Sequence, residues 1–165
     1  MTENLKEWTL TALEGARRLE KEGFLFYTKA GFKTQNQKGR EMFDFLAVEE
    51  AKHYKIVDNM VKTFGGQTKI LEEEAAEESG VFAEARGGRL DEKSDNLDAL
   101  NIGIQAEHKS IELYTSIHDK TDSKELKKAM KKLIQEEKKH LSILETEAEF
   151  ITETGEWHDF RTVSM

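Results

Sequence analysis

One pattern of glutamate, tyrosine and histidine occurs twice in this chain, at a constant offset of 87 residues. In each copy a tyrosine follows a glutamate after seven residues, and an E-x-x-H motif begins thirty residues after that same glutamate. Four carboxylates and two imidazoles in this order are typical of a dinuclear metal site inside a four-helix bundle. The repeat therefore predicts an all-α fold with two related halves. Its members are Glu20, Tyr27, Glu50 and His53, then Glu107, Tyr114, Glu137 and His140.

The apolar residues around these motifs recur every three or four positions, which is the spacing of one helical face. Leu46 and Val57, for example, lie on the same stripe as Glu50 and His53. The chain contains no proline, so nothing of that kind interrupts long helices. The expected helices cover residues 3–33, 38–64, 95–119 and 123–152.

The spacing of the motifs also places the turns. The first pair of glutamates can meet only if the chain reverses near residue 35, and the second pair requires a reversal near residue 122. Two antiparallel hairpins of matched length result. The connection between them is too long for a simple turn and favours a crossover along the bundle, with a short helix over 75–86. A flexible acidic linker between two independent hairpins is the alternative.

A chain of 165 residues with 37% hydrophobic content is long enough for one domain with a single core. Trp157, His158 and Phe160 in the irregular C-terminal tail suggest that the tail packs back on the bundle. The expected layout of the domain, residues 1–165, is a hairpin over 3–64, a crossover over 65–94, a hairpin over 95–152 and a tail over 153–165.

The composition excludes several classes of function. The formal net charge of −8 argues against a nucleic-acid-binding protein, which needs a basic surface. No apolar run has the length of a membrane span, and the first residues lack a signal-peptide core. The absence of cysteine excludes disulfides, thiolate nucleophiles and iron–sulfur or rubredoxin-type centres within the chain. We expect a cytoplasmic protein that binds neither nucleic acid nor membrane.

The repeated carboxylates lie within apolar stripes, where an unpaired charge would cost several kcal/mol. Two divalent cations would balance the four negative charges, and a neutral imidazole can complete each cation without changing that balance. In E-x-x-H the glutamate and the histidine lie one turn apart on one helical face, so both can reach one metal ion. The alternatives are hydrogen-bonded polar residues in the core, or a face that is in fact exposed to solvent.

Glu49 and Glu136 are a further repeated pair. Each lies four residues before a histidine of the repeat, so spacing alone leaves them open as ligands. Since the bundle motif uses a separation of three residues, Glu50 and Glu137 are the preferred ligands.

The repeated tyrosines, Tyr27 and Tyr114, lie two turns from Glu20 and Glu107 on the same helical faces. They are either core aromatics with a polar tip or phenols that donate a hydrogen bond to a ligating carboxylate. The second interpretation makes them candidate catalytic residues that act through the metal ligands.

With these two motifs, E-x6-Y and E-x-x-H, each present twice, the chain resembles the rubrerythrin-like branch of the ferritin-like diiron proteins. The resemblance covers the four expected helices and implies a ferritin-like four-helix bundle that holds two iron ions. Oxygen and nitrogen ligands also leave manganese or zinc open. The implied ligands are Glu50 and Glu137 as bridges, Glu20 and Glu107 as terminal or chelating ligands, and His53 and His140 on one iron each.

The resemblance implies reduction of hydrogen peroxide or oxygen, often by a homodimer. Rubrerythrins carry an additional glutamate three residues after the ligand of the third helix, and Ser110 occupies that position here. They also carry a cysteine-rich rubredoxin domain that delivers electrons, so this chain would need an external donor, either a rubredoxin-like protein or a small reductant. The alternatives are a ferroxidase or iron-handling protein, and a non-catalytic metal-binding bundle.

Overall fold

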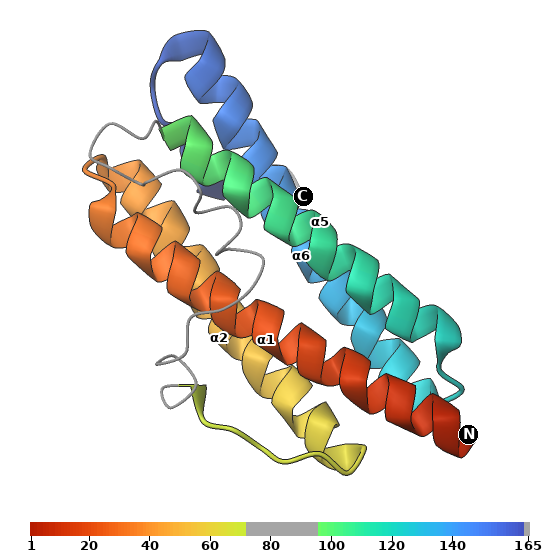
Figure 1. The fold of residues 1–165 in the computed structure, drawn as a ribbon. Helices are drawn as coiled ribbons and strands as arrows, with labels where there is room; N and C mark the ends of the chain where they lie inside the picture. Colours follow the sequence, from red (N-terminus) through yellow and green to blue (C-terminus); the bar gives the residue numbers. More distant parts are fainter. Residues whose placement is uncertain (72–95, 164–165) are drawn as a thin grey trace.

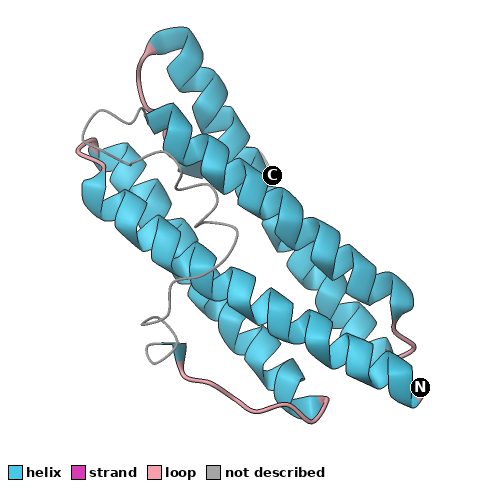
Figure 2. Ribbon diagram, viewed as in Figure 1, coloured by secondary structure: helices cyan, strands magenta, loops and turns pink. Residues whose placement is uncertain are grey.

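The computed structural model describes residues 1–71 and 96–163, and within these ranges it contains four long α-helices and one short 3-10 helix (Figures 1 and 2). The predicted all-α four-helix bundle is confirmed. Each α-helix begins and ends within two residues of the expected position. The elements are α1 (Glu3–Lys33), α2 (Gln37–Thr63), α5 (Asn96–Lys120), α6 (Lys124–Thr154) and η1 (Phe160–Thr162).

Polar side chains cap three of the helices at their N-termini. The side-chain oxygens of Thr2, Asn36 and Ser123 accept hydrogen bonds from the first free backbone N–H groups of α1, α2 and α6. At the C-terminus of α6 the chain turns at Gly155, whose φ of 74° is costly for any residue with a Cβ atom. The chain reverses in the short segments 34–36 and 121–123, where the sequence predicted turns.

Each helix packs against its hairpin partner, α1 on α2 and α5 on α6. Between the hairpins α1 faces α5 and α2 faces α6, and the contact is closer on the α1–α5 side. The last turn of α2 and the first turn of α5 lie at opposite ends of the bundle (Figure 1). The helix expected over 75–86, and most of the expected crossover, fall outside the described residues.

The core consists of two apolar clusters, one toward each end of the bundle. The first includes Phe43 and Leu144, and the second includes Leu13 and Met130. Because the stripes that form both clusters alternate with charged faces, the helices are amphipathic. None of the helices within the described ranges is long and apolar enough to cross a membrane.

The C-terminal tail folds back on the first cluster. Trp157 is buried, and its ring lies edge-on to the ring of Phe43 with 6.0 Å between centroids. This approach requires a glycine at the start of α2, because a Cβ atom on Gly39 would lie 2.8 Å from the indole. Further along the tail, the ring of Phe160 packs on that of Phe45 with a centroid separation of 5.2 Å.

Candidate metal centre

A layer of buried polar residues separates the two apolar clusters. None of its six residues is more than 4% exposed, and each of the four long helices contributes at least one. They are the six residues that the repeat predicted as metal ligands, and the structure brings all of them together. The layer consists of Glu20 from α1, Glu50 and His53 from α2, Glu107 from α5, and Glu137 and His140 from α6.

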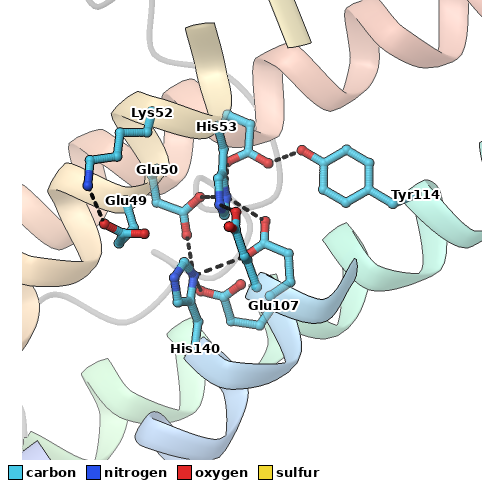
Figure 3. Close-up of polar contacts among 10 residues, drawn as sticks. Glu49, Glu50, Lys52, His53, Glu107, Tyr114 and His140 are labelled. Atoms are coloured by element: carbon cyan, nitrogen blue, oxygen red, sulfur yellow. Dashed lines mark hydrogen bonds and ion pairs between the residues drawn. The ribbon is translucent and has the colours of Figure 1, made fainter. Parts of the chain in front are cut away.

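The two carboxylates at the middle of the layer each present one oxygen to each histidine. Nδ1 of His53 lies 3.7 Å from Oε2 of Glu50 and 3.3 Å from Oε1 of Glu137. Nδ1 of His140 lies 3.6 Å from Oε1 of Glu50 and 3.0 Å from Oε2 of Glu137. Figure 3 shows Glu50 between the two histidines. This is the arrangement of two carboxylates that bridge two neighbouring cations, and one ligand atom from each of these four residues lies within 4.8 Å of the others.

The remaining two glutamates lie at opposite ends of this arrangement. Oε2 of Glu20 is 3.6 Å from Nδ1 of His53, and Oε1 of Glu107 is 3.8 Å from Nδ1 of His140. Two equivalent sets of donors result. The first, here named the His53 position, combines Glu20 and His53 with one oxygen from each bridging carboxylate. The second, the His140 position, combines Glu107 and His140 with the other two oxygens.

Several polar atoms of the His53 position are buried without a hydrogen-bond partner. They are Oε2 of Glu20, Nδ1 of His53 and Oε1 of Glu137. An unsatisfied buried polar atom costs about 1–3 kcal/mol, and more when the group is charged. All three point at the place where a cation bound by these residues would lie, so the donor set fits a divalent metal ion.

Burial and mutual repulsion change the acidity of the layer. Burial, followed by the charge of Glu50, raises the pKa of Glu20 to about 8, and burial with the charge of Glu137 raises the pKa of Glu107. Burial alone would lower the pKa of His140, but hydrogen bonds to Glu137 and Glu50 raise it to about 10. The layer therefore holds protons that entering cations would displace.

Each tyrosine of the repeat donates its hydrogen bond to the glutamate of the other hairpin. The hydroxyl of Tyr27 on α1 lies 2.6 Å from Oε1 of Glu107 on α5. Tyr114 on α5 donates in the same way to Oε1 of Glu20 on α1 (Figure 3). Burial and the neighbouring carboxylates raise the pKa of both phenols well above the ordinary value, so both remain donors. The sequence suggested a phenol–carboxylate contact but did not indicate the exchange between hairpins.

The profile of the Rubrerythrin family matches residues 11–148, a range that contains the complete polar layer. The chain belongs to the rubrerythrin family. Its fold is similar to that of a solved ferritin-like, diiron-carboxylate protein from Bacillus anthracis str. Ames, with a TM-score of 0.68 and 16% identity. That likeness covers 90% of this chain and 99% of the other, and it confirms the ferritin-like architecture. The comparison with curated proteins gives no match.

Outside the polar layer of this rubrerythrin-family chain, the repeated pair Glu49 and Glu136 has two different environments. Oε2 of Glu136 lies 2.8 Å from Nε2 of His53, the ring nitrogen that faces away from the centre. Glu49 instead pairs with Lys52 on its own helix at 2.8 Å (Figure 3). Neither carboxylate faces Nδ1 of a histidine, so the structure places both outside the donor sets that spacing left open to them.

The outer side of His140 is covered by an aromatic ring. Phe45 lies edge-on to the imidazole, with 6.3 Å between centroids and 83° between the ring planes. Phe45 in turn contacts Phe160 of the tail. The His140 position is thus backed by apolar residues that connect it to the C-terminus.

A small cavity reaches the centre from the α1–α5 side. Its lining includes Gly23, Ser110, Glu50 and Glu107. Ser110 stands where rubrerythrins carry an additional glutamate, and its short side chain contributes to the open space. A Cβ atom on Gly23 would lie 3.3 Å from Cγ of Glu50, so glycine lets the bridging carboxylate approach α1 closely.

The sequence interpretation missed the buried carboxylate of Glu147. Glu147 on α6 is 0% exposed, and its Oε1 accepts a hydrogen bond from the backbone N–H of His158 at 2.7 Å. Burial raises the pKa of Glu147 to about 7. The signal was present, because Glu147 follows His140 by seven residues on the same stripe as Leu144. It lies outside the donor sets and anchors the tail of this rubrerythrin-family chain.

Proposed function

We propose that this chain binds about two iron ions and reduces hydrogen peroxide or oxygen with electrons from an external donor. The family and the ferritin-like fold suggest diiron binding, and the buried cluster of glutamate and histidine fits it. The single observation that carries the proposal is that each of two buried carboxylates presents one oxygen to each of two histidines.

Charge balance and geometry support a specific set of ligands. Four carboxylates offset the charge of two divalent ions, and the imidazoles bind through Nδ1 without adding charge. The bridging role follows from the two-sided contacts of the central pair, and the terminal role follows from the placement of the outer pair beside one histidine each. The proposed ligands are Glu50 and Glu137 as bridges, Glu20 and His53 at the His53 position, and Glu107 and His140 at the His140 position.

The tyrosines would keep the terminal carboxylates in place during turnover. Tyr114 donates to Oε1 of Glu20 and leaves Oε2, which faces His53, for a metal ion. Tyr27 donates to Oε1 of Glu107, the oxygen that also lies nearest Nδ1 of His140. Because both phenols retain their protons, they stabilise the charged form of these carboxylates. The apolar clusters at either side exclude bulk water, and the small cavity beside Ser110 offers space for a small oxidant next to Glu50 and Glu107.

Two bound ferrous ions would supply the two electrons that, with two protons, convert hydrogen peroxide to two water molecules. The chain has no cysteine and so cannot hold a rubredoxin-type centre of its own. A rubredoxin-like protein or a small reductant is therefore the proposed source of electrons.

The test is to load the protein with ferrous ion in the absence of oxygen and to mix it rapidly with peroxide or with oxygen. We expect about two iron ions per chain, oxidation by at least one of the two reagents, and continued turnover when a chemical reductant is present. The exposed glutamate Glu112 on α5 supplies a control, since Glu112→Ala should leave the rate unchanged while Glu107→Ala on the same helix should abolish it.

Failure of the reduced, iron-loaded protein to react with either oxidant would contradict the redox proposal and favour a structural metal site. Release of ferric ion from the chain after each oxidation would instead indicate iron handling. The two results differ in where the iron is found after the reaction, and gel filtration followed by elemental analysis distinguishes them.

A further inference from the structure

The two histidines of the centre differ in what their outer nitrogens contact. His53 is 1% exposed, and its Nε2 lies 2.8 Å from Oε2 of Glu136, whose side chain is 29% exposed. This contact joins α2 to α6 across the gap between the hairpins. A carboxylate can only accept a hydrogen bond, so Nε2 of His53 carries the proton.

A proton fixed on Nε2 leaves Nδ1 as the nitrogen that can bind a metal ion. Nδ1 of His53 is the atom that faces Glu20, Glu50 and Glu137. A carboxylate behind a ligating imidazole holds the ring in its orientation, fixes the tautomer and makes the ligating nitrogen more basic. Glu136 therefore holds the His53 ring so that Nδ1 faces the place of the cation, which displaces the proton on Nδ1 when it binds.

The ring of His140 has no such carboxylate behind it among the contacts of the described residues. By the offset of the repeat, Glu49 is the counterpart of Glu136, but its carboxylate pairs with Lys52 instead of with a histidine. The imidazole of His140 instead packs on the ring of Phe45, nearly perpendicular to it. An uncharged phenyl ring restricts the position of the imidazole, but it lacks the carboxylate that would fix the tautomer and make the ligating nitrogen more basic.

We infer that Glu136 is a positioning residue for His53 and makes the two metal positions unequal, so that the His53 position binds a divalent ion more tightly. The inference rests on the metal binding in the proposed function but not on any reaction with an oxidant. It assigns a role in metal binding to Glu136 and none to Glu49, its counterpart in the repeat.

The first measurement is a titration of the metal-free protein with Co²⁺, followed by its visible absorption. We expect two binding steps, of which Glu136→Gln weakens the tighter one by about 10-fold to 100-fold. Glutamine keeps a neutral acceptor for Nε2, so Glu136→Ala should weaken that step further. Glu49→Gln is the matched control, since it removes the same charge from the equivalent position and should change neither step.

The second measurement reports on His53 directly. In the Zn²⁺-loaded protein, which is diamagnetic, the Nε2 proton of His53 should appear far downfield in the proton NMR spectrum and exchange slowly with water. Glu136→Gln should shift this resonance upfield and speed its exchange, whereas Glu49→Gln should not. A residue that merely supports the fold would change the melting temperature without moving this resonance selectively.

Two equal Co²⁺ steps in the unmodified protein, or equal weakening by Glu49→Gln and Glu136→Gln, would overturn the inference and leave the proposed function intact. An unshifted Nε2 resonance in Glu136→Gln would also overturn it. A protein that binds no Co²⁺ at any step would overturn the metal site itself, so the two failures are distinguishable.

Discussion

The His53 and His140 positions share the same inner donors but differ in their surroundings. At both, a terminal glutamate, a histidine and one oxygen from each bridging carboxylate converge. Behind His53 lies the partly exposed carboxylate of Glu136, and behind His140 lies the ring of Phe45 with the tail beyond it. The donors inside the buried layer must balance one another's charge, so they are the same at both positions. The residues behind the two histidines are not under this constraint and can differ.

Part of the divergence can be traced to a single position of the repeat. Phe45 corresponds by the offset of 87 to Lys132, which is exposed and has no aromatic ring to cover an imidazole. The lysines do not explain the rest, since Glu49 pairs with Lys52 whereas Glu136, which has Lys139 at the same spacing, contacts His53. Two helices with the same ligands thus give one metal position a charged support and the other an apolar one.

The largest effect should come from the donors that the two positions share. His53→Ala and His140→Ala each remove the only imidazole of one position, so each should reduce the bound metal from about two ions per chain to about one. Elemental analysis after saturation and desalting measures this. His108→Ala, at an exposed histidine next to Glu107 on α5, is the control. Equal loss from all three variants would contradict the assignment of His53 and His140 as ligands, and loss of both ions in either ligand variant would show that the two positions are not independent.

A smaller effect is expected at Glu147, the buried carboxylate that anchors the C-terminal tail. The Phe160 ring of this tail contacts Phe45 behind the His140 position. The folded-state pKa of Glu147, about 7, lies above its ordinary value of 4.5. The protonated acid therefore stabilises the fold fully below the lower value, and this stabilisation is lost as the pH rises through the higher one. At about pH 8, Glu147→Gln should raise the free energy of unfolding by up to about 3 kcal/mol.

Urea denaturation of this variant at several pH values gives the measurement. The gain should shrink toward zero below about pH 4, where the natural acid is largely protonated in both states. Glu149→Gln, at an exposed position of the same helix, should give no such pH dependence. A gain that is independent of pH would mean that ionisation of Glu147 does not limit tail docking.

The smallest effect should come from the tyrosines, where the two positions are most alike. Tyr27→Phe and Tyr114→Phe each remove one donor from a buried carboxylate, which should lower the stability of the metal-free protein by about 1–2 kcal/mol. Denaturation in the presence of a chelator measures both losses. If only one variant is destabilised, the two metal positions differ at their terminal glutamates as well as behind their histidines.

The sequence was sufficient to predict the helices, the turns and the six buried donors, because a repeat with constant spacing constrains all of them at once. It could not predict that Tyr27 pairs with Glu107, since helical spacing defines a face but not the helix opposite. Nor could it separate Glu49 from Glu136, which differ only in contacts made after the hairpins pack. Helical periodicity cannot predict which side chains meet when helices that are distant in the chain pack together.

The exchange of tyrosines makes the hairpins depend on one another. A hairpin alone would bury a glutamate whose phenol donor belongs to the other hairpin, and it would lack one of the four donors of its own position, the carboxylate from the other hairpin. Expressed as two separate fragments, cut between the hairpins, neither piece should fold alone, yet the two should assemble when mixed. Rejoined in this way, the fragments would form a split protein whose reconstitution could be followed by the recovery of metal binding.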